Sequence, residues 1–161
     1  MITFNADEVF EMAEQIERNG AGFYRKAAGL GHGKPAAELL LNLAKDEDEH
    51  ERTFTRMRSQ LTAAARAETN FDPEGEGALY LHAMVQGRIF NFKAVPADKL
   101  TGAESLQDIL RIAIELEKDS ILFYYTLRKM VPEEAGKARI HDIIDQEVGH
   151  IATLSKRMAQ P

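Results

Sequence analysis

Apolar residues recur along this chain at spacings of three and four, the period of an amphipathic helix, and the pattern predicts four main helices. The first begins near Asn5, which can form a capping box with Glu8. Gly20 and Gly22 weaken its middle, where a kink is one interpretation, but we expect a continuous helix that packs closely there. A glycine-rich turn over residues 29–33 ends this helix.

The second helix is long. Pro35 suits its first position, and its apolar face continues to about Ala65. A connection follows, in which we expect a short helix at about residues 78–90 and a loop over residues 92–100. Capping boxes that start at Thr101 or Ser105 can begin the third helix. That helix extends to about Met130, and Pro132 separates it from the fourth.

Two helical hairpins, at about residues 5–67 and 105–159, are thus joined by a connection over about residues 68–104. A connection of this length can return the third helix parallel to the second. We therefore predict a single domain, residues 1–161, with the all-α fold of a ferritin-like four-helix bundle and a long crossover. Exchange of hairpins between two chains would give the same bundle, and we expect a homodimer or higher homo-oligomer.

Composition narrows the function classes. The chain has 161 residues, 44% hydrophobic and 29% charged, which is enough to bury a core. A net charge of −6 argues against nucleic acid as a partner. No apolar run could span a membrane and no secretory signal is present, so we expect a cytoplasmic location. The absence of Cys excludes disulfides and iron–sulfur clusters.

Two Glu-x-x-His motifs, Glu47 to His50 and Glu147 to His150, occupy the predicted second and fourth helices. Residues three apart share a helix face, so each motif can aim a carboxylate and an imidazole at one point. The motif alone is weak evidence, because chance placement gives about 0.5 such pairs in a chain of this composition. The positions of residues elsewhere in the chain make the two motifs stronger evidence.

A second pair of features lies the same number of residues apart as the two motifs. Glu17 is followed by Phe23-Tyr24, and Glu117 is followed by Phe123-Tyr124. Repetition of four residue types at one offset indicates two similar helical hairpins.

Six polar residues fall on the apolar stripes and are predicted to face the core: Glu17, Glu47, His50, Glu117, Glu147 and His150. Four ionised carboxylates there would repel one another and lose hydration, so cations are needed to hold them. Two divalent ions would neutralise the four charges. Oxygen-rich ligation with one imidazole per ion favours iron, with manganese as the second choice.

We expect Glu47 and Glu147 to bridge the two ions, with Glu17 and Glu117 as terminal ligands and one histidine on each ion. Six side chains shared by two ions leave positions open for dioxygen or hydrogen peroxide.

Further residues are candidates to support these ligands. Tyr24 and Tyr124 each follow their glutamate by about two turns, so each phenol can hydrogen-bond a ligand carboxylate, although paired core tyrosines would show the same spacing. Asp46 and Gln146 can orient the imidazole of a facing helix, or simply be solvated. Glu14 could add a carboxylate, but we expect it to be exposed to solvent.

Together these motifs resemble the diiron motif of the ferritin-like superfamily, and the segment 116–124 is especially similar to its rubrerythrin-like branch. The resemblance covers all four main helices. It implies two iron ions that cycle between Fe(II) and Fe(III). It also implies reaction with hydrogen peroxide or dioxygen, as peroxide reduction or protective iron oxidation under oxidative stress.

Two features depart from full rubrerythrins. No Cys means no rubredoxin domain, and Ser120 stands where a further carboxylate is expected, three residues after Glu117. Turnover would therefore need a separate electron-donor protein. The alternative functions are iron storage or delivery without catalysis, and a structural bundle stabilised by its metals.

Overall fold

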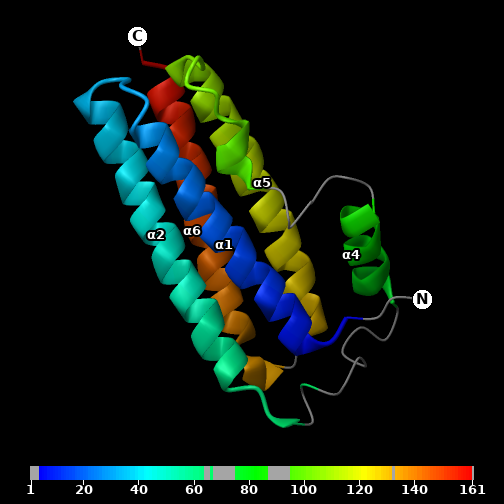
Figure 1. Cartoon of the computed structure of the whole chain (residues 1–161). Coiled ribbons are helices and arrows are strands. Elements are labelled where there is room, and N and C mark those ends of the chain that lie inside the picture. The colour runs from blue at the N-terminus through cyan, green and yellow to red at the C-terminus, as the bar shows by residue number, and fades with distance from the viewer. Residues whose placement is uncertain (1–3, 64–65, 67–74, 87–94, 132, 161) are drawn as a thin grey trace.

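The computed structural model describes residues 4–63, 66, 75–86, 95–131 and 133–160 (Figure 1). The predicted all-α four-helix bundle is confirmed. Its long helices are α1 (Ala6–Ala28), α2 (Lys34–Ser59), α5 (Leu106–Met130) and α6 (Lys137–Met158). Shorter helices are α4 (Glu76–Gln86), η1 (Pro96–Lys99) and η2 (Glu133–Ala135). None of the helices in the described ranges is long and apolar enough to cross a membrane.

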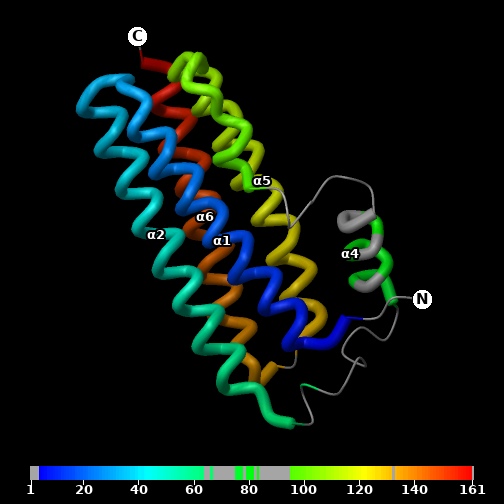
Figure 2. The backbone as a smooth tube through the Cα atoms, viewed as in Figure 1, coloured from blue at the N-terminus to red at the C-terminus, as the bar shows by residue number. Residues whose placement is uncertain are grey.

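The direction of the four long helices follows the predicted crossover connectivity. In Figure 1, α1 and α2 form an antiparallel hairpin, and α5 starts at the end of the bundle where α2 also starts. The third long helix therefore runs parallel to the second, as the smooth trace in Figure 2 also shows. The end of α2 and the start of α5 lie at opposite ends of the bundle. Of the elements between them, α4 contacts α5 and η1 contacts α1.

Capping boxes begin two of the long helices. Asn5 and Glu8 exchange hydrogen bonds of 2.9 Å, as the sequence predicts for α1. At α5 the cap is Ser105, paired with Asp108. The alternative box at Thr101 does not begin the helix. Thr101 donates hydrogen bonds to the Glu104 carboxylate within the turn that precedes the Ser105 cap.

One predicted boundary and one predicted loop were wrong. The second helix ends at Ser59 rather than near Ala65: Leu61, beyond the Gln60 cap, still packs into the core, so an apolar position continues the pattern without continuing the helix. The short helix predicted at about residues 78–90 is present as α4, Glu76–Gln86, and residues 87–90 lie outside the described part. The predicted loop over residues 92–100 contains η1. Pro132 also lies outside the described residues.

The expected continuity of the first helix is confirmed, since α1 runs without interruption through both glycines. The expected close packing is found at Gly20, where an added Cβ would lie 3.4 Å from the Glu47 carboxylate. Gly22 has no neighbour within 4 Å of such a Cβ. Only the first of the two glycines therefore packs against a predicted ligand side chain.

The core consists of two apolar clusters, one toward each end of the bundle. The first includes Phe10, Phe54 and Leu127. The second includes Phe23 and Leu110. Full burial of each such side chain contributes about 1.5–3 kcal/mol. On every long helix a buried glutamate lies between the residues of the two clusters, and this polar layer holds the predicted ligands.

Candidate metal centre

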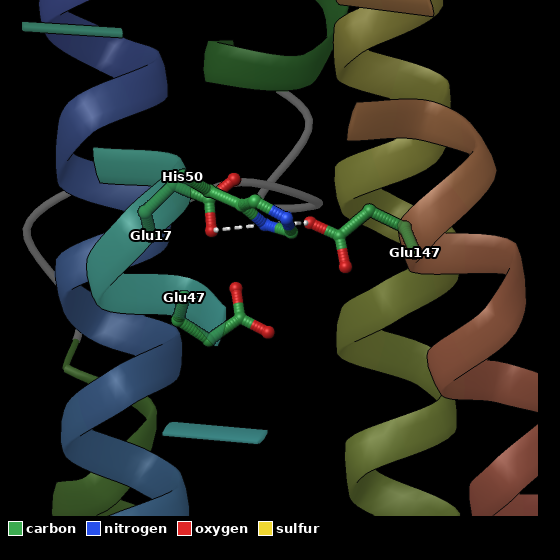
Figure 3. A group of neighbouring side chains, drawn as sticks. All are labelled: Glu17, Glu47, His50 and Glu147. Atoms are coloured by element: carbon green, nitrogen blue, oxygen red, sulfur yellow. Dashed lines mark ion pairs between the residues drawn. The ribbon is translucent and has the colours of Figure 1, made fainter. Parts of the chain in front are cut away.

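All six predicted ligand side chains meet in this polar layer, and each long helix supplies at least one of them. They form two overlapping groups, each offering four donor atoms that lie within 4.8 Å of one another. The first group is Glu17, Glu47, His50 and Glu147, drawn in Figure 3. The second is Glu47, Glu117, Glu147 and His150. A single chain provides every member of both groups.

Glu47 and Glu147 belong to both groups, which is the arrangement expected of two bridging carboxylates. Glu17 and His50 belong to the first group alone, and Glu117 and His150 to the second alone. The six side chains therefore define two adjacent positions, each with three carboxylates and one imidazole.

The cluster is buried on all sides. Glu17 and Glu147 are 0% exposed, and the most exposed of the six, His150, is only 7% exposed. Desolvation at this depth makes an uncompensated carboxylate cost several kcal/mol. The helices are nevertheless well packed around these groups, so a compensating partner is required.

Several donor atoms of the cluster face one another at ion-pair distance but make no hydrogen bond. The unpartnered buried atoms include both carboxylate oxygens of Glu147 and the Nδ1 atoms of His50 and His150. The Glu147 oxygens lie 3.0 Å from Nδ1 of His50 and 2.8 Å from Nδ1 of His150. Buried polar atoms without partners are rare and call for an explanation such as an ion. Convergent oxygens and imidazole nitrogens fit two divalent transition-metal ions.

Both imidazoles present Nδ1 to the cluster and Nε2 to an outer acceptor. Nε2 of His50 lies 2.8 Å from Oε1 of Gln146, and Nε2 of His150 lies 3.4 Å from a carboxylate oxygen of Asp46. A proton on Nε2 directed at these acceptors leaves the Nδ1 lone pair free for a metal. Asp46 and Gln146 thus contact the imidazole of a facing helix, which is the geometry that the sequence suggested.

The two buried tyrosines cross between the hairpins. Tyr24 of α1 donates a hydrogen bond to Oε1 of Glu117, and Tyr124 of α5 donates one to Oε1 of Glu17. Each phenol therefore fixes one oxygen of the carboxylate that belongs to the other hairpin. The second oxygen of Glu17 has no hydrogen-bond partner.

Comparison with known proteins agrees with this geometry. The family model of rubrerythrin matches residues 8–158. The chain belongs to the rubrerythrin family. A crystal structure from Thermotoga maritima, described provisionally as a ferritin-like diiron-carboxylate protein, is similar at a TM-score of 0.72 and 22% identity. The match covers 99% of this chain and 98% of that one, and it supports the ferritin-like fold. No curated protein matches the sequence.

Protonation offsets part of the carboxylate charge when no metal is bound to this rubrerythrin-family chain. Burial raises the pKa of Glu17 and of Glu117 well above the usual range, and the neighbouring carboxylates act in the same direction. Burial opposes a charge on His50 as well, but contact with Glu147 raises the pKa of His50 to about 8. Metal binding must displace such protons.

Glu147 carries the opposite shift. Burial would raise its pKa, but contacts with His150 and His50 outweigh burial and lower the pKa to about 2. Its charge is therefore retained between the two imidazoles, at the position predicted to bridge the ions. Burial also raises the pKa of Tyr24 and Tyr124, so both phenols keep the proton that they donate.

Glu14 was wrongly expected to be exposed. It is 8% exposed, and one of its oxygens lies 3.5 Å from the Arg58 guanidinium of α2. It belongs to neither group of converging donors. The pairing is with a residue 44 positions away, and no local pattern reveals it.

Gly20 is the residue near the cluster whose role sequence reasoning identified only as close packing. A Cβ at Gly20 would lie in van der Waals contact with the Glu47 carboxylate, so Gly20 packs directly against this ligand. The signal was present in the spacing, because Gly20 follows Glu17 by three residues and shares its helix face. Ser120, at the equivalent place on α5, donates its hydroxyl hydrogen bond to the Leu116 carbonyl.

Proposed function

We propose that this chain binds two iron ions through Glu17, Glu47, His50, Glu117, Glu147 and His150 and reduces hydrogen peroxide or dioxygen. Manganese is the alternative metal. The observation that carries the proposal is the convergence of unpartnered, buried carboxylate oxygens and imidazole Nδ1 atoms in two adjacent groups. Membership of the rubrerythrin family supports the same chemistry.

Two bound iron ions would each supply one electron, changing from Fe(II) to Fe(III), so that hydrogen peroxide and two protons yield two water molecules. Glu47 and Glu147 would bind both ions and hold them close together. Glu17 and Glu117 would each hold one of the two ions.

The surrounding residues control orientation and access. Tyr24 and Tyr124 act as positioning residues, because their hydrogen bonds fix the Glu117 and Glu17 carboxylates before metal arrives. Ser120 supplies no fourth carboxylate, and its hydroxyl is engaged by the helix backbone. Each position therefore has four protein donors, which leaves coordination sites for an oxidant.

Return to the Fe(II) state needs two electrons from outside the cluster. We expect a separate electron-donor protein to supply them, because the chain contains no cysteine from which an iron–sulfur relay could be built.

The first test is metal loading without oxygen. The purified protein should bind two Fe(II) per chain, and addition of hydrogen peroxide should oxidise both, seen as Fe(III) absorption in the near ultraviolet. A chemical reductant should restore Fe(II) and permit further cycles. Bound iron that neither peroxide nor dioxygen changes would refute the enzymatic role. Uptake far beyond two ions per chain would instead identify a storage protein.

Replacement of a shared carboxylate tests the ligand assignment. Glu47→Ala should abolish the paired site and leave at most one weakly bound ion. Glu49→Ala is the matched control, because Glu49 lies on the same helix but is exposed and pairs with Arg52. Retention of two coupled irons in Glu47→Ala would exclude this set of ligands.

A further inference from the structure

The two predicted ion positions have the same inner composition. Each is bounded by three carboxylates and one histidine Nδ1, and the two bridging carboxylates are common to both. Each also has one terminal glutamate held by one tyrosine, Glu17 by Tyr124 and Glu117 by Tyr24. Inner donors and tyrosines alone therefore give neither position a preference for metal.

The outer partners of the two histidines break this equivalence. His150, in the group with Glu117, directs Nε2 at the Asp46 carboxylate, 3.4 Å away. His50, in the group with Glu17, directs Nε2 at the neutral amide oxygen of Gln146, 2.8 Å away. Asp46 and Gln146 occupy equivalent places in the two hairpins, one residue before the shared glutamates. Behind the two histidines, the halves therefore differ by a charge at a matched place.

A carboxylate behind a ligating imidazole makes the imidazole more basic, and it adds a negative charge near the ion. The Gln146 amide oxygen is hydrogen-bonded to its imidazole and adds no net charge, whereas the Asp46 carboxylate lies at ion-pair distance and adds one. Loss of such an outer partner typically weakens metal binding about 10- to 100-fold. Asp46 has a side chain that is 56% exposed, so solvent screening places its effect at the lower end of that range.

We propose that the two positions fill in order. The position bounded by Glu117 and His150 takes the first divalent ion, and the position bounded by Glu17 and His50 takes the second more weakly. Asp46 and Gln146 are the positioning residues that set this order. The inference rests on the proposed metal centre and adds that the ion beside His50 is the exchangeable one.

Cobalt(II) provides the test, because it is not oxidised under the conditions of the experiment and can be located by its anomalous scattering. Crystals of the full chain are prepared with one Co(II) per chain, at a protein concentration well above the dissociation constant. The occupancy beside His150 should exceed that beside His50 by about tenfold. Equal occupancy, including the equal occupancy that strongly cooperative pairwise binding would give, overturns the proposal.

The variants separate charge from general damage to the fold. Asp46→Asn should bring the two occupancies close together and weaken the first binding step about tenfold in a competition titration. The double variant Asp46→Asn with Gln146→Glu should reverse the order. Persistence of the wild-type order in the double variant would refute the role of this pair, since the charge would then have moved without effect.

Asp145→Asn is the control, because it removes the same charge one residue before Gln146, from an exposed side chain that faces His141. It should leave both occupancies unchanged, and a shift equal to that of Asp46→Asn would show that net charge alone is responsible. Co(II) bound nowhere in the cluster of the wild-type protein would refute the proposed metal centre itself. Two ions bound with equal affinity would refute only the order.

Discussion

Tyr124→Phe tests whether the crossing tyrosines stabilise the charged form of their glutamates. The ring of Tyr124 is 0% exposed and would still fill its place in the core, so the substitution removes one hydroxyl and creates almost no cavity. The lost interaction is a hydrogen bond to Oε1 of Glu17, itself 0% exposed. The free energy of unfolding should therefore report that single bond.

The size of the effect depends on whether Glu17 is ionised. Without metal, burial raises the pKa of Glu17 and favours its protonated form, for which a hydrogen bond contributes about 0.5–1.5 kcal/mol. A bound ion requires the carboxylate, for which the bond contributes about 1.5–3 kcal/mol. Tyr124→Phe should thus cost about 1 kcal/mol more in the loaded protein, equivalent to Co(II) binding weakened about fivefold.

Urea unfolding with a chelator and with saturating Co(II) measures both values. Tyr125→Phe is the matched control, because this neighbouring tyrosine is 49% exposed and should change neither value by more than about 0.5 kcal/mol. A Tyr124→Phe cost that is the same with and without metal would contradict the link between this phenol and ionised Glu17.

Two further outcomes follow from other contacts. Gly20→Ala and Gly22→Ala should each stabilise the metal-free protein by up to about 1 kcal/mol through helix propensity. The larger side chain of Gly20→Val should displace Glu47 and reduce Co(II) binding, measured by calorimetry. A Gly20→Val variant that binds two ions normally would show that the space is not needed. A hydrogen bond from Arg58 lowers the pKa of Asp7. The pair therefore stabilises the fold at pH values above the ordinary pKa of 3.8, and this stabilisation is lost as the pH falls through the lowered pKa. Asp7→Asn should accordingly lower the melting temperature at pH 7, and the difference from wild type should vanish at the acid end of a pH series.

The sequence predicts this fold well because the capping motifs and the apolar periodicity indicate the same helices. The glutamates and histidines occupy positions where an apolar residue would be expected, and such residues reach the core whenever the helix forms. The same logic fails at the end of α2. Leu61 continues the apolar period but is buried beyond the helix, whose C-cap is Gln60.

Contacts between residues far apart in the sequence were harder to predict. Glu14 looks like any solvated acid at the edge of a helix stripe, and its burial depends on the Arg58 guanidinium of α2. Periodicity gives the face of a helix but not the partner that meets it. The crossing of Tyr24 to Glu117, rather than to the glutamate of its own helix, is set by how the two hairpins dock.

The sharing of Glu47 and Glu147 has a consequence for the stability of the whole chain. Each predicted ion position takes three side chains from one hairpin and one from the other, so an ion bound there would contact both hairpins. Removing the ions would leave the contacts within each hairpin intact and weaken the junction between them. The metal content of a preparation would then measure how firmly the two halves of the molecule are joined.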